Sequence, residues 1–286
     1  MKQKKLVLID GFSYLYRAYY AFPNLKDKEG QFIGAQYGMT KMMKKIFSQD
    51  YVKYASIIFD ARGKNFRHNL FKQYKRNRNP MPENLKTQIY PILNTIKNFG
   101  IPIIIKKGVE ADDVIGTIAK KAEKEKWKIL ICTNDKDFIQ LISKNIFITN
   151  RNLDEILGIE EVLQKFGIHP NLFVDYIALV GDRADNIPGV PGIGKVTAVK
   201  LLSRIGNLKK IYYKIKNLEK NKIVDLKKIF LILKEYKKTA FLSYKLAKIR
   251  TNLDLKVNLK NFFLNKKEIL KNIKSAEKIL NLKNFF

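Results

Sequence analysis

Cysteine, histidine and acidic side chains are all scarce in this chain of 286 residues. Its one cysteine, Cys132, excludes an intramolecular disulfide, and two histidines do not make the His/Cys clusters that bind zinc. No apolar run is long enough for a signal peptide or a membrane span. Gly/Ser-rich linkers and internal repeats are also absent. We therefore expect a soluble, cytoplasmic protein that does not depend on disulfides.

The scarcity of acids leaves 26 acidic residues against 56 basic ones, a formal net charge of +30. With this excess, the positive side chains repel one another in the folded state, and such a charge usually indicates a polyanionic partner. An AT-rich genome and an anionic membrane are competing explanations, but no long basic amphipathic helix with bulky aromatics supports a membrane. The apolar fraction of 46% fits a globular protein of one large or two small domains. We expect a monomer that binds nucleic acid and no membrane.

The first half of the chain alternates between uninterrupted apolar runs and segments with helical spacing. The runs have the character of strands buried on both faces, and they cover residues 5–11, 54–60, 101–105, 128–132 and 145–149. Strands that alternate with helices imply right-handed crossovers and a mostly parallel sheet with helices on both faces. From about residue 151 onward, helical periodicity takes over to the end. The predicted fold class is therefore α/β with a helical C-terminal region.

Nine acidic residues follow or end the predicted elements at positions that should converge. They are Asp10, Asp60, Glu110, Asp112, Asp113, Asp135 and Asp137 on four successive strands, and Asp182 and Asp185 after an apolar helix. One such aspartate is as often a turn residue, but repetition on four strands favours a shared site at the carboxyl edge of the sheet. Oxygen ligands alone suit magnesium or manganese, and a pair of these ions can hydrolyse a phosphodiester.

A basic stretch lies between the second and third runs. It contains Arg62, Lys64, Arg67, Lys72, Lys75, Arg76 and Arg78, interleaved with Phe66, Phe71 and Tyr74. Aromatic rings among cations suit stacking on unpaired bases and contact with phosphates. The competing interpretation is a solvated amphipathic helix. Further along, Gly189, Gly192 and Gly194 precede a helical segment, which is typical of a helix-hairpin-helix that grips a nucleic-acid backbone.

Five motifs stand in the order found in structure-specific 5′ nucleases: Val7–Gly11, Phe59–Ala61, Val109–Asp113, Asp135–Asp137 and Gly181–Gly189. The sequence resembles this family over nearly its whole length, and most of all the 5′–3′ exonuclease domain of bacterial DNA polymerase I. The resemblance implies a Rossmann-like, PIN-like nuclease core over residues 1–165 with a basic arch at about 62–100. It also implies a helical DNA-binding region over 166–286, with the helix-hairpin-helix at about 187–203.

The resemblance further implies that the protein removes nucleotides or flaps from 5′ ends of duplex DNA, including RNA primers paired with DNA. It divides the nine acids between two metal ions, with Asp135, Asp137, Asp182 and Asp185 on the second and the rest on the first. Lys75 and Arg78 match arch residues that polarise the scissile phosphate. Tyr74 matches a residue that stacks at the cleavage site, and Arg17 one near the 5′ strand.

The remaining implied contacts are to the DNA backbone. The expected contact residues are Arg62, Lys64, Arg67, Lys72, Arg76, Gly189, Gly192, Gly194 and Lys195, with a potassium ion at the helix-hairpin-helix. The family's hairpin lysine falls at position 196, where this chain has Val196 beside Lys195. The chain also ends at Phe286, so we expect a free-standing nuclease without polymerase activity, which a separate DNA polymerase would complement.

Three other functions compete with this prediction. A DNA-binding protein that has lost catalysis would not be expected to keep nine mutually repelling carboxylates. A PIN-type ribonuclease shares the acidic sheet edge but not the basic arch or the segment from Gly181 to Ala198. A phosphatase of the haloacid-dehalogenase type requires a second aspartate two residues after Asp10, where this chain has Phe12. A metal-dependent 5′ nuclease remains the favoured function.

Overall fold

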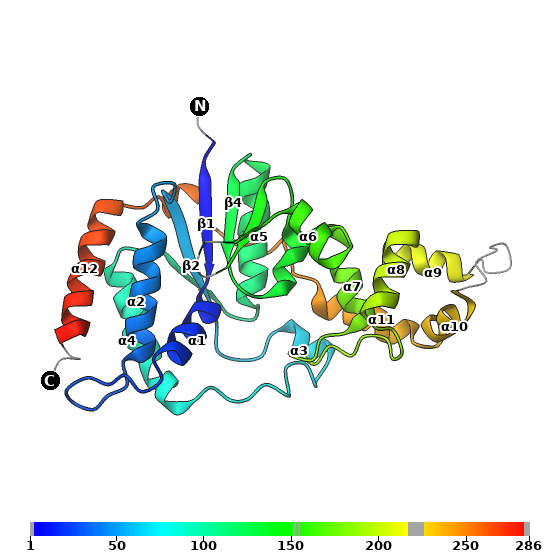
Figure 1. Cartoon of the computed structure of the whole chain (residues 1–286), viewed down its shortest axis with the longest axis horizontal. Coiled ribbons are helices and arrows are strands. Elements are labelled where there is room, and N and C mark those ends of the chain that lie inside the picture. The colour runs from blue at the N-terminus through cyan, green and yellow to red at the C-terminus, as the bar shows by residue number, and fades with distance from the viewer. Residues whose placement is uncertain (1–2, 151–152, 154, 217–225, 283–286) are drawn as a thin grey trace.

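The computed structural model describes residues 3–150, 153, 155–216 and 226–282, and Figure 1 shows their arrangement. Six strands form one sheet in the order β3-β2-β1-β4-β5-β6. Their bounds are Lys5–Asp10 (β1), Tyr54–Asp60 (β2), Ile103–Lys106 (β3), Lys128–Cys132 (β4), Ile146–Thr149 (β5) and Ile156–Leu157 (β6). β1 to β5 pair in parallel, which confirms the mostly parallel sheet.

The central strand β1 explains why its sequence is apolar without interruption. Leu6 and Leu8 face one buried core and Val7 and Ile9 face the other, and all four are at most 1% exposed. Strands covered on both faces need apolar side chains in both directions. One face carries α1 (Gly11–Ala21), α2 (Gly34–Phe47), α4 (Glu83–Asn98) and α12 (Lys266–Leu282); the other carries α5 (Ala111–Lys124) and the 3₁₀ helix η1 (Lys136–Leu141).

The remaining helices extend from the α5 side of the sheet, toward the right in Figure 1. They are α6 (Ile159–Phe166), η2 (Pro170–Leu172), α7 (Phe173–Val180), α8 (Lys195–Ile205), α9 (Leu208–Lys216), α10 (Lys227–Glu235) and α11 (Lys237–Ala247), with the short α3 (Phe66–Leu70) beneath them and η5 (Leu259–Phe262) leading to α12. The buried Phe138, Phe173 and Phe230 belong to one continuous core, so this helical part shares its interior with the sheet.

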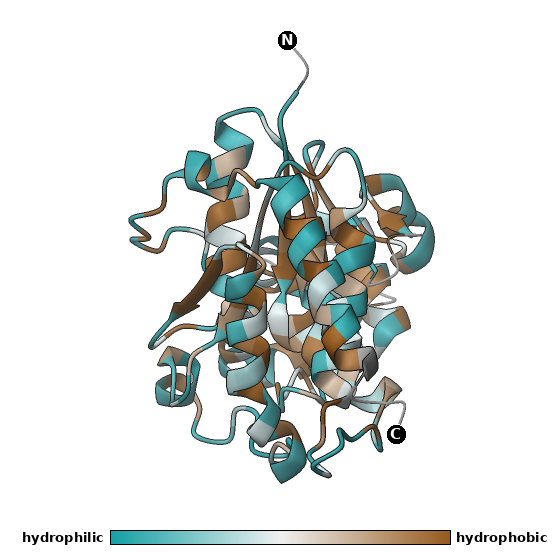
Figure 2. Ribbon diagram, turned by 90° about the vertical axis from the view of Figure 1, so that its left-hand side faces the viewer, coloured by the Kyte–Doolittle hydropathy of each residue, from teal (hydrophilic) through white to brown (hydrophobic). Residues whose placement is uncertain are grey.

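Two features depart from the helical pattern predicted beyond residue 151. The two-residue strand β6 pairs antiparallel with β5, and a strand so short leaves no periodicity to detect. The last helix, α12, returns to the N-terminal layer, where Ile269 and Ile273 are buried with Met43 of α2. In Figure 2 the strands are largely apolar and the helices in front of them carry apolar and polar bands. The division near residue 165 stays a prediction. Within the described ranges, no helix combines the length and apolar character needed to cross a membrane.

Candidate active site

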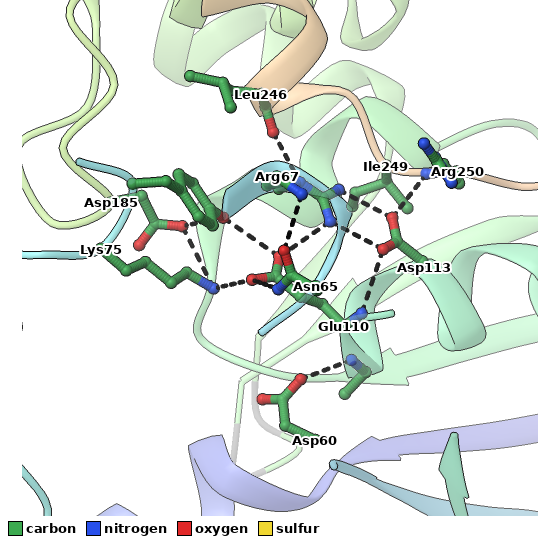
Figure 3. Close-up of polar contacts among 12 residues, drawn as sticks. Asp60, Asn65, Arg67, Lys75, Glu110, Asp113, Asp185, Leu246, Ile249 and Arg250 are labelled. Atoms are coloured by element: carbon green, nitrogen blue, oxygen red, sulfur yellow. Dashed lines mark hydrogen bonds and ion pairs between the residues drawn. The ribbon is translucent and has the colours of Figure 1, made fainter. Parts of the chain in front are cut away.

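The carboxyl ends of β1 and β2 bring two of the predicted acids to one edge of the sheet. Asp10 ends β1 and caps α1, where its Oδ1 accepts from the Ser13 N–H at 3.1 Å and its Oδ2 from the Thr133 hydroxyl at 2.7 Å. Asp60 ends β2 and accepts from the Ala111 N–H at 2.7 Å, which ties this strand to the start of α5 (Figure 3). The predicted convergence of acids on this edge therefore holds for the first two strands.

The start of α5 gives its three acids different surroundings. Asp113 is fully buried, and its two oxygens receive both terminal nitrogens of Arg67 at 2.8 Å and the Arg250 N–H at 2.8 Å. It also accepts from the Glu110 N–H at 3.2 Å in a capping box. Because the protein itself satisfies both oxygens, the structure does not support Asp113 as a metal ligand.

Asp112, by contrast, accepts no hydrogen bond and forms no ion pair with any described residue. Burial, followed by repulsion from Asp135, Glu110 and Asp10, raises the pKa of its carboxyl well above the ordinary value. Burial raises the pKa of Asp10 to about 6, although hydrogen bonds from Thr133 and Ser13 oppose the rise. Lys75 only partly offsets this repulsion at Asp112, and a divalent ion would relieve the remainder.

The second group of acids lies on η1 and on the loop after α7. A two-way backbone bridge between Asp182 and Ile187 closes that loop, and Asp182 accepts from the Ala184 and Asp185 N–H groups. Lys136 contacts the other Asp182 oxygen at 2.5 Å. Asp137 Oδ1 is buried and has no hydrogen-bond partner among the described residues. Burial and the neighbouring carboxylates raise the pKa of Asp137 well above its usual range.

Residues of the predicted arch bridge the two groups of acids. Lys75 Nζ lies 2.6 Å from Glu110 and 3.6 Å from Asp185 (Figure 3), and the Tyr74 hydroxyl lies 3.2 Å and 2.9 Å from the same two side chains. Arg78 pairs with the other oxygen of Asp185. Burial alone would raise the pKa of Asp185, but Lys75 and Arg78 outweigh it and lower that pKa. The protein thus uses Lys75 and Arg78 to place positive charge between the two groups of acids.

Two predicted arch roles do not fit this arrangement. Arg67 is 2% exposed, and besides Asp113 it contacts Glu110 at 3.0 Å and donates to the Leu246 and Lys248 carbonyls, so it cannot reach DNA here. Tyr74 is 3% exposed, so its ring is not available to stack on a base. The basic stretch also does not form the solvated amphipathic helix of the competing interpretation. The other predicted contacts, Arg62, Lys64, Lys72 and Arg76, are exposed, and Arg17 is half-buried on α1.

The base of the arch is docked on the acidic loop by backbone and amide contacts. The Lys75 N–H donates to the Asp185 carbonyl at 3.0 Å, and the Asn186 side chain donates to the Gln73 carbonyl at 2.6 Å. Lys75 and Asn186 have φ of +56° and +54°, a conformation rare for side chains with a Cβ. Strained residues of this kind gather at functional sites, where the surrounding contacts hold them in place.

The acids and the arch cations face a common opening. A cavity of about 160 Å³ is lined by Asp60 and Glu110 together with Lys75 and Arg78. Within the described part of the chain, no three acidic, histidine or cysteine side chains are arranged as a metal-binding set. The cations between the two groups account for that. The donor chemistry nevertheless fits hard divalent ions, because among the described residues the buried Asp137 Oδ1 atom has no hydrogen-bond partner and the half-buried Asp112 carboxyl accepts no hydrogen bond.

The predicted helix-hairpin-helix occupies the turn between α7 and α8. Gly189 is buried with φ +67°, its N–H donates to the Ser243 hydroxyl, and a Cβ there would lie 2.4 Å from the Gly181 nitrogen. The predicted DNA contact from Gly189 is therefore wrong, because close packing of the two backbones requires this glycine. Gly192, Gly194 and Lys195 are exposed at the start of α8, as a phosphate contact needs, and Val196 is 84% exposed beside them.

Four residues of the site were not predicted. Asn65 donates to Glu110 at 2.9 Å, Thr133 supports Asp10, Lys136 pairs with Asp182, and His68 lines the cavity with its ring against Tyr74. Thr133 and Lys136 stand next to Asp135 and could have been inferred from that position. Asn65 and His68 lie in the basic stretch, where the prediction rested on lysine, arginine and aromatic side chains.

The chain matches models of known protein families over most of its length. Residues 5–167 match the N-terminal resolvase-like domain of 5′–3′ exonucleases, and residues 168–272 match the C-terminal SAM fold of the same enzymes. The chain belongs to the 5′–3′ exonuclease family. This membership confirms the resemblance seen in the sequence, the α/β core with a helical C-terminal part, and the activity of a 5′ nuclease that hydrolyses phosphodiester bonds.

Similar proteins within the 5′–3′ exonuclease family include both free-standing and fused forms. A 5′–3′ exonuclease of Buchnera aphidicola subsp. Schizaphis graminum is 44% identical over 259 residues, covering 90% of each chain. DNA polymerase I of Pseudomonas aeruginosa is 39% identical over 92% of this chain but only 29% of its own length. A bacteriophage T5 flap endonuclease, solved with DNA and metal ions, has a TM-score of 0.67 at 20% identity, covering 95% of this chain and 100% of that one. The last likeness shows a shared fold.

The raised pKa of Asp10 makes a testable prediction for the metal-free protein. Its carboxyl has a pKa of about 6 in the folded state against an ordinary value of 3.8, so folding favours the protonated form. This contribution to stability is complete below about pH 3.8 and is lost as the pH rises through about 6, a loss of about 3 kcal/mol. In EDTA, Asp10→Asn should therefore gain stability relative to the wild type between pH 4 and pH 7 in denaturant melts. A constant difference between the two proteins over that range would contradict the burial of a repelled carboxyl.

Proposed function

We propose that this chain is a magnesium- or manganese-dependent 5′–3′ exonuclease and flap endonuclease that acts on DNA. The observation that carries the proposal is the cavity in which carboxylates face Lys75 and Arg78. A site for a metal alone would not need cations, and a site for a phosphate alone would not need acids. A phosphodiester held by cations beside a metal ion requires both, and the T5 flap endonuclease supports this because it was solved with DNA and metal ions.

The acids divide into two sets that could each hold one ion. Asp10, Asp60, Glu110 and Asp112 surround the ends of β1 and β2, and Asp135, Asp137, Asp182 and Asp185 lie on η1 and the loop after α7. When bound, two such ions lower the pKa of a water molecule and stabilise the leaving oxygen of the phosphodiester. Asp113 is left out of these sets because its oxygens are bonded to Arg67 and Arg250.

The arch cations have two tasks in this proposal. Lys75 and Arg78 neutralise Glu110 and Asp185 when no substrate is present, which keeps buried carboxylates close together. They also line the cavity beside Asp60 and Glu110, so a phosphate that enters it meets both the cations and the acids. A cation that binds a non-bridging phosphate oxygen stabilises the charge that develops in the transition state. Tyr74 fixes the spacing of Glu110 and Asp185, and Arg17 on α1 is proposed to contact the 5′ strand.

Duplex DNA is proposed to bind along the exposed cations of the arch and the start of α8. Gly192, Gly194 and Lys195 present exposed backbone at a helix N-terminus, which favours a phosphate. A potassium ion in this hairpin belongs to the same proposal. The substrates would include 5′ ends, 5′ flaps and RNA primers on DNA during replication and repair. A cytoplasmic monomer that works beside a separate DNA polymerase is the setting that we propose.

The proposal is tested with a flap duplex labelled on the 5′ strand and a matched duplex with a 3′ flap. Cleavage near the 5′ junction is expected with magnesium or manganese, and none is expected in EDTA or on the 3′ flap. Lys75→Met should reduce the rate by about 100-fold, the usual effect of losing one preorganised charge, with Lys271→Met on α12 as the exposed control outside the proposed DNA path. Cleavage in EDTA, or equal cleavage of both flaps, would overturn the assignment.

A further inference from the structure

A large groove lies on the side of α3 away from the acidic cavity. It encloses about 1240 Å³ between α3, α7, α11, the start of α9 and the segment 248–254. Three aromatic rings, from Phe66, Phe241 and Tyr244, line it. This volume is much larger than that of the cavity beside the acids, and neither the metal sites nor the hairpin described above uses it.

The groove carries more positive charge than its own acids can balance. Lys209, Lys245, Lys248 and Arg250 line it, all are exposed, and none forms a salt bridge within the described ranges. Asp175 is buried and bonded to the Leu208 N–H at 2.8 Å, which leaves Asp254 as the exposed acid of the lining. The lining therefore attracts a polyanion, because Asp175, whose charge interacts with Lys248, and Asp254 together balance at most half of its positive charge.

The cations and the rings of the groove are interleaved. The Arg250 guanidinium lies 3.2 Å from the centre of the Phe66 ring, and Lys248 Nζ lies 5.8 Å from that of Tyr244. Cations set on aromatic faces are the arrangement that holds unpaired bases by stacking and their phosphates by charge. A duplex hides the faces of its bases, so it cannot use these rings. An acidic peptide could use the charges but gains little from flat aromatic surfaces.

The groove is joined to the catalytic centre through one layer of residues. The Arg250 N–H donates to Asp113, and Arg67 donates to the Leu246 and Lys248 carbonyls while it holds Asp113 and Glu110 (Figure 3). Phe66 and Arg67 are neighbours on α3, one facing the groove and the other the acids. The groove and the acidic cavity therefore lie on opposite sides of α3 and share its residues as a common wall.

We propose that this groove binds the unpaired, single-stranded 5′ segment of the substrate. The proposal rests on the proposed function for the source of that strand, but the binding itself requires neither metal nor cleavage. Tyr244 and Phe241 stack on the bases, while Lys245, Lys248 and Arg250, the last held against the Phe66 ring, contact the phosphates. A 5′ flap is thereby distinguished from a 5′ end without one by the additional surface that it contacts.

The test measures fluorescence anisotropy of a labelled ten-nucleotide oligothymidylate in EDTA. Lys245→Ala/Lys248→Ala/Arg250→Ala should weaken binding at least about tenfold, and the slope of log K against log salt should become shallower by about 2, because three phosphate contacts are lost. The matched control, Lys267→Ala/Lys271→Ala/Lys274→Ala, removes the same charge from exposed positions on α12 and should change binding less than about threefold. Equal losses in the two triple variants would overturn the proposal.

Two further measurements separate stacking from charge and from misfolding. Tyr244→Leu keeps an apolar side chain and the net charge, and it should weaken oligothymidylate binding about fivefold without changing the affinity for an abasic oligomer of the same length. Thermal melts of all variants in EDTA check the fold. Equal binding of the abasic oligomer, or its displacement by deca-glutamate as readily as by oligothymidylate, would show a general polyanion or peptide site and sink the proposal. These binding measurements use no metal, so they are independent of the cleavage assay. If the protein failed to cleave flaps, a positive binding result would still hold. If the binding test failed, intact cleavage would not support the groove proposal.

Discussion

Replacing Asp112 with asparagine is expected to lower the rate of 5′-flap cleavage by about a thousandfold, since metal-assisted stabilisation of the transition state is worth several kcal/mol. The same change should raise the melting temperature of the metal-free protein. The Asp112 carboxylate is half-buried, accepts no hydrogen bond from the described residues, and is repelled by Asp135, Glu110 and Asp10, which Lys75 only partly offsets. A neutral amide of nearly the same shape removes that repulsion. Loss of activity with gain of stability is the signature of a functional carboxylate.

The matched control is Asp50→Asn. Asp50 is fully exposed and pairs only with Lys266 at 3.0 Å, and such surface pairs contribute little to stability. This variant should cleave flaps and melt as the wild type does. Both rates are measured at saturating magnesium, and both melts are recorded in EDTA. If Asp112→Asn lost activity and stability together, the carboxylate would have a structural role in place of the one proposed.

The convergence of acids could be predicted because it follows from topology alone. Apolar runs that end in Asp10 and Asp60 must deliver those residues to one edge once the strands are parallel, whatever the details of packing. The family resemblance then divided the nine acids between two metal ions, and the second group lies at the start of η1 and on the loop after α7, where periodicity gives no register. The same reasoning could not rank the acids, because sequence spacing does not show which oxygens the protein itself will satisfy.

Asp113 and Arg67 show what that reasoning missed. In the sequence, Asp113 is one of three clustered acids and Arg67 one of seven clustered cations. Their bidentate pair joins positions 46 residues apart and is closed by carbonyls of Leu246 and Lys248 from the far end of the chain. Composition predicts that a basic stretch meets phosphate. It cannot predict that one arginine of the stretch turns inward, because that depends on tertiary packing.

Arg67 should consequently be a stability residue in spite of its place among DNA-binding cations. Arg67→Met is expected to cost about 3 to 5 kcal/mol of unfolding free energy, because it leaves Asp113 and Glu110 buried without their partner. Arg67→Lys should recover only part of this, since an ammonium cannot make the two parallel bonds to Asp113. Arg62→Met, an exposed change five residues earlier, should lie within about 0.5 kcal/mol of the wild type. Urea melts in EDTA measure all three.

A double-mutant cycle decides whether the pair itself is responsible. Asp113→Asn removes the charge but keeps an oxygen for the Arg250 N–H, so the double variant with Arg67→Met should cost less than the sum of the single changes. Strict additivity would mean that the two side chains do not interact as described. DNA affinity supplies the opposite check. The contrary outcome for Arg67→Met is unchanged stability, weaker DNA binding and a salt slope of binding reduced by about 1. That result would make Arg67 a phosphate contact and would contradict the buried position described here.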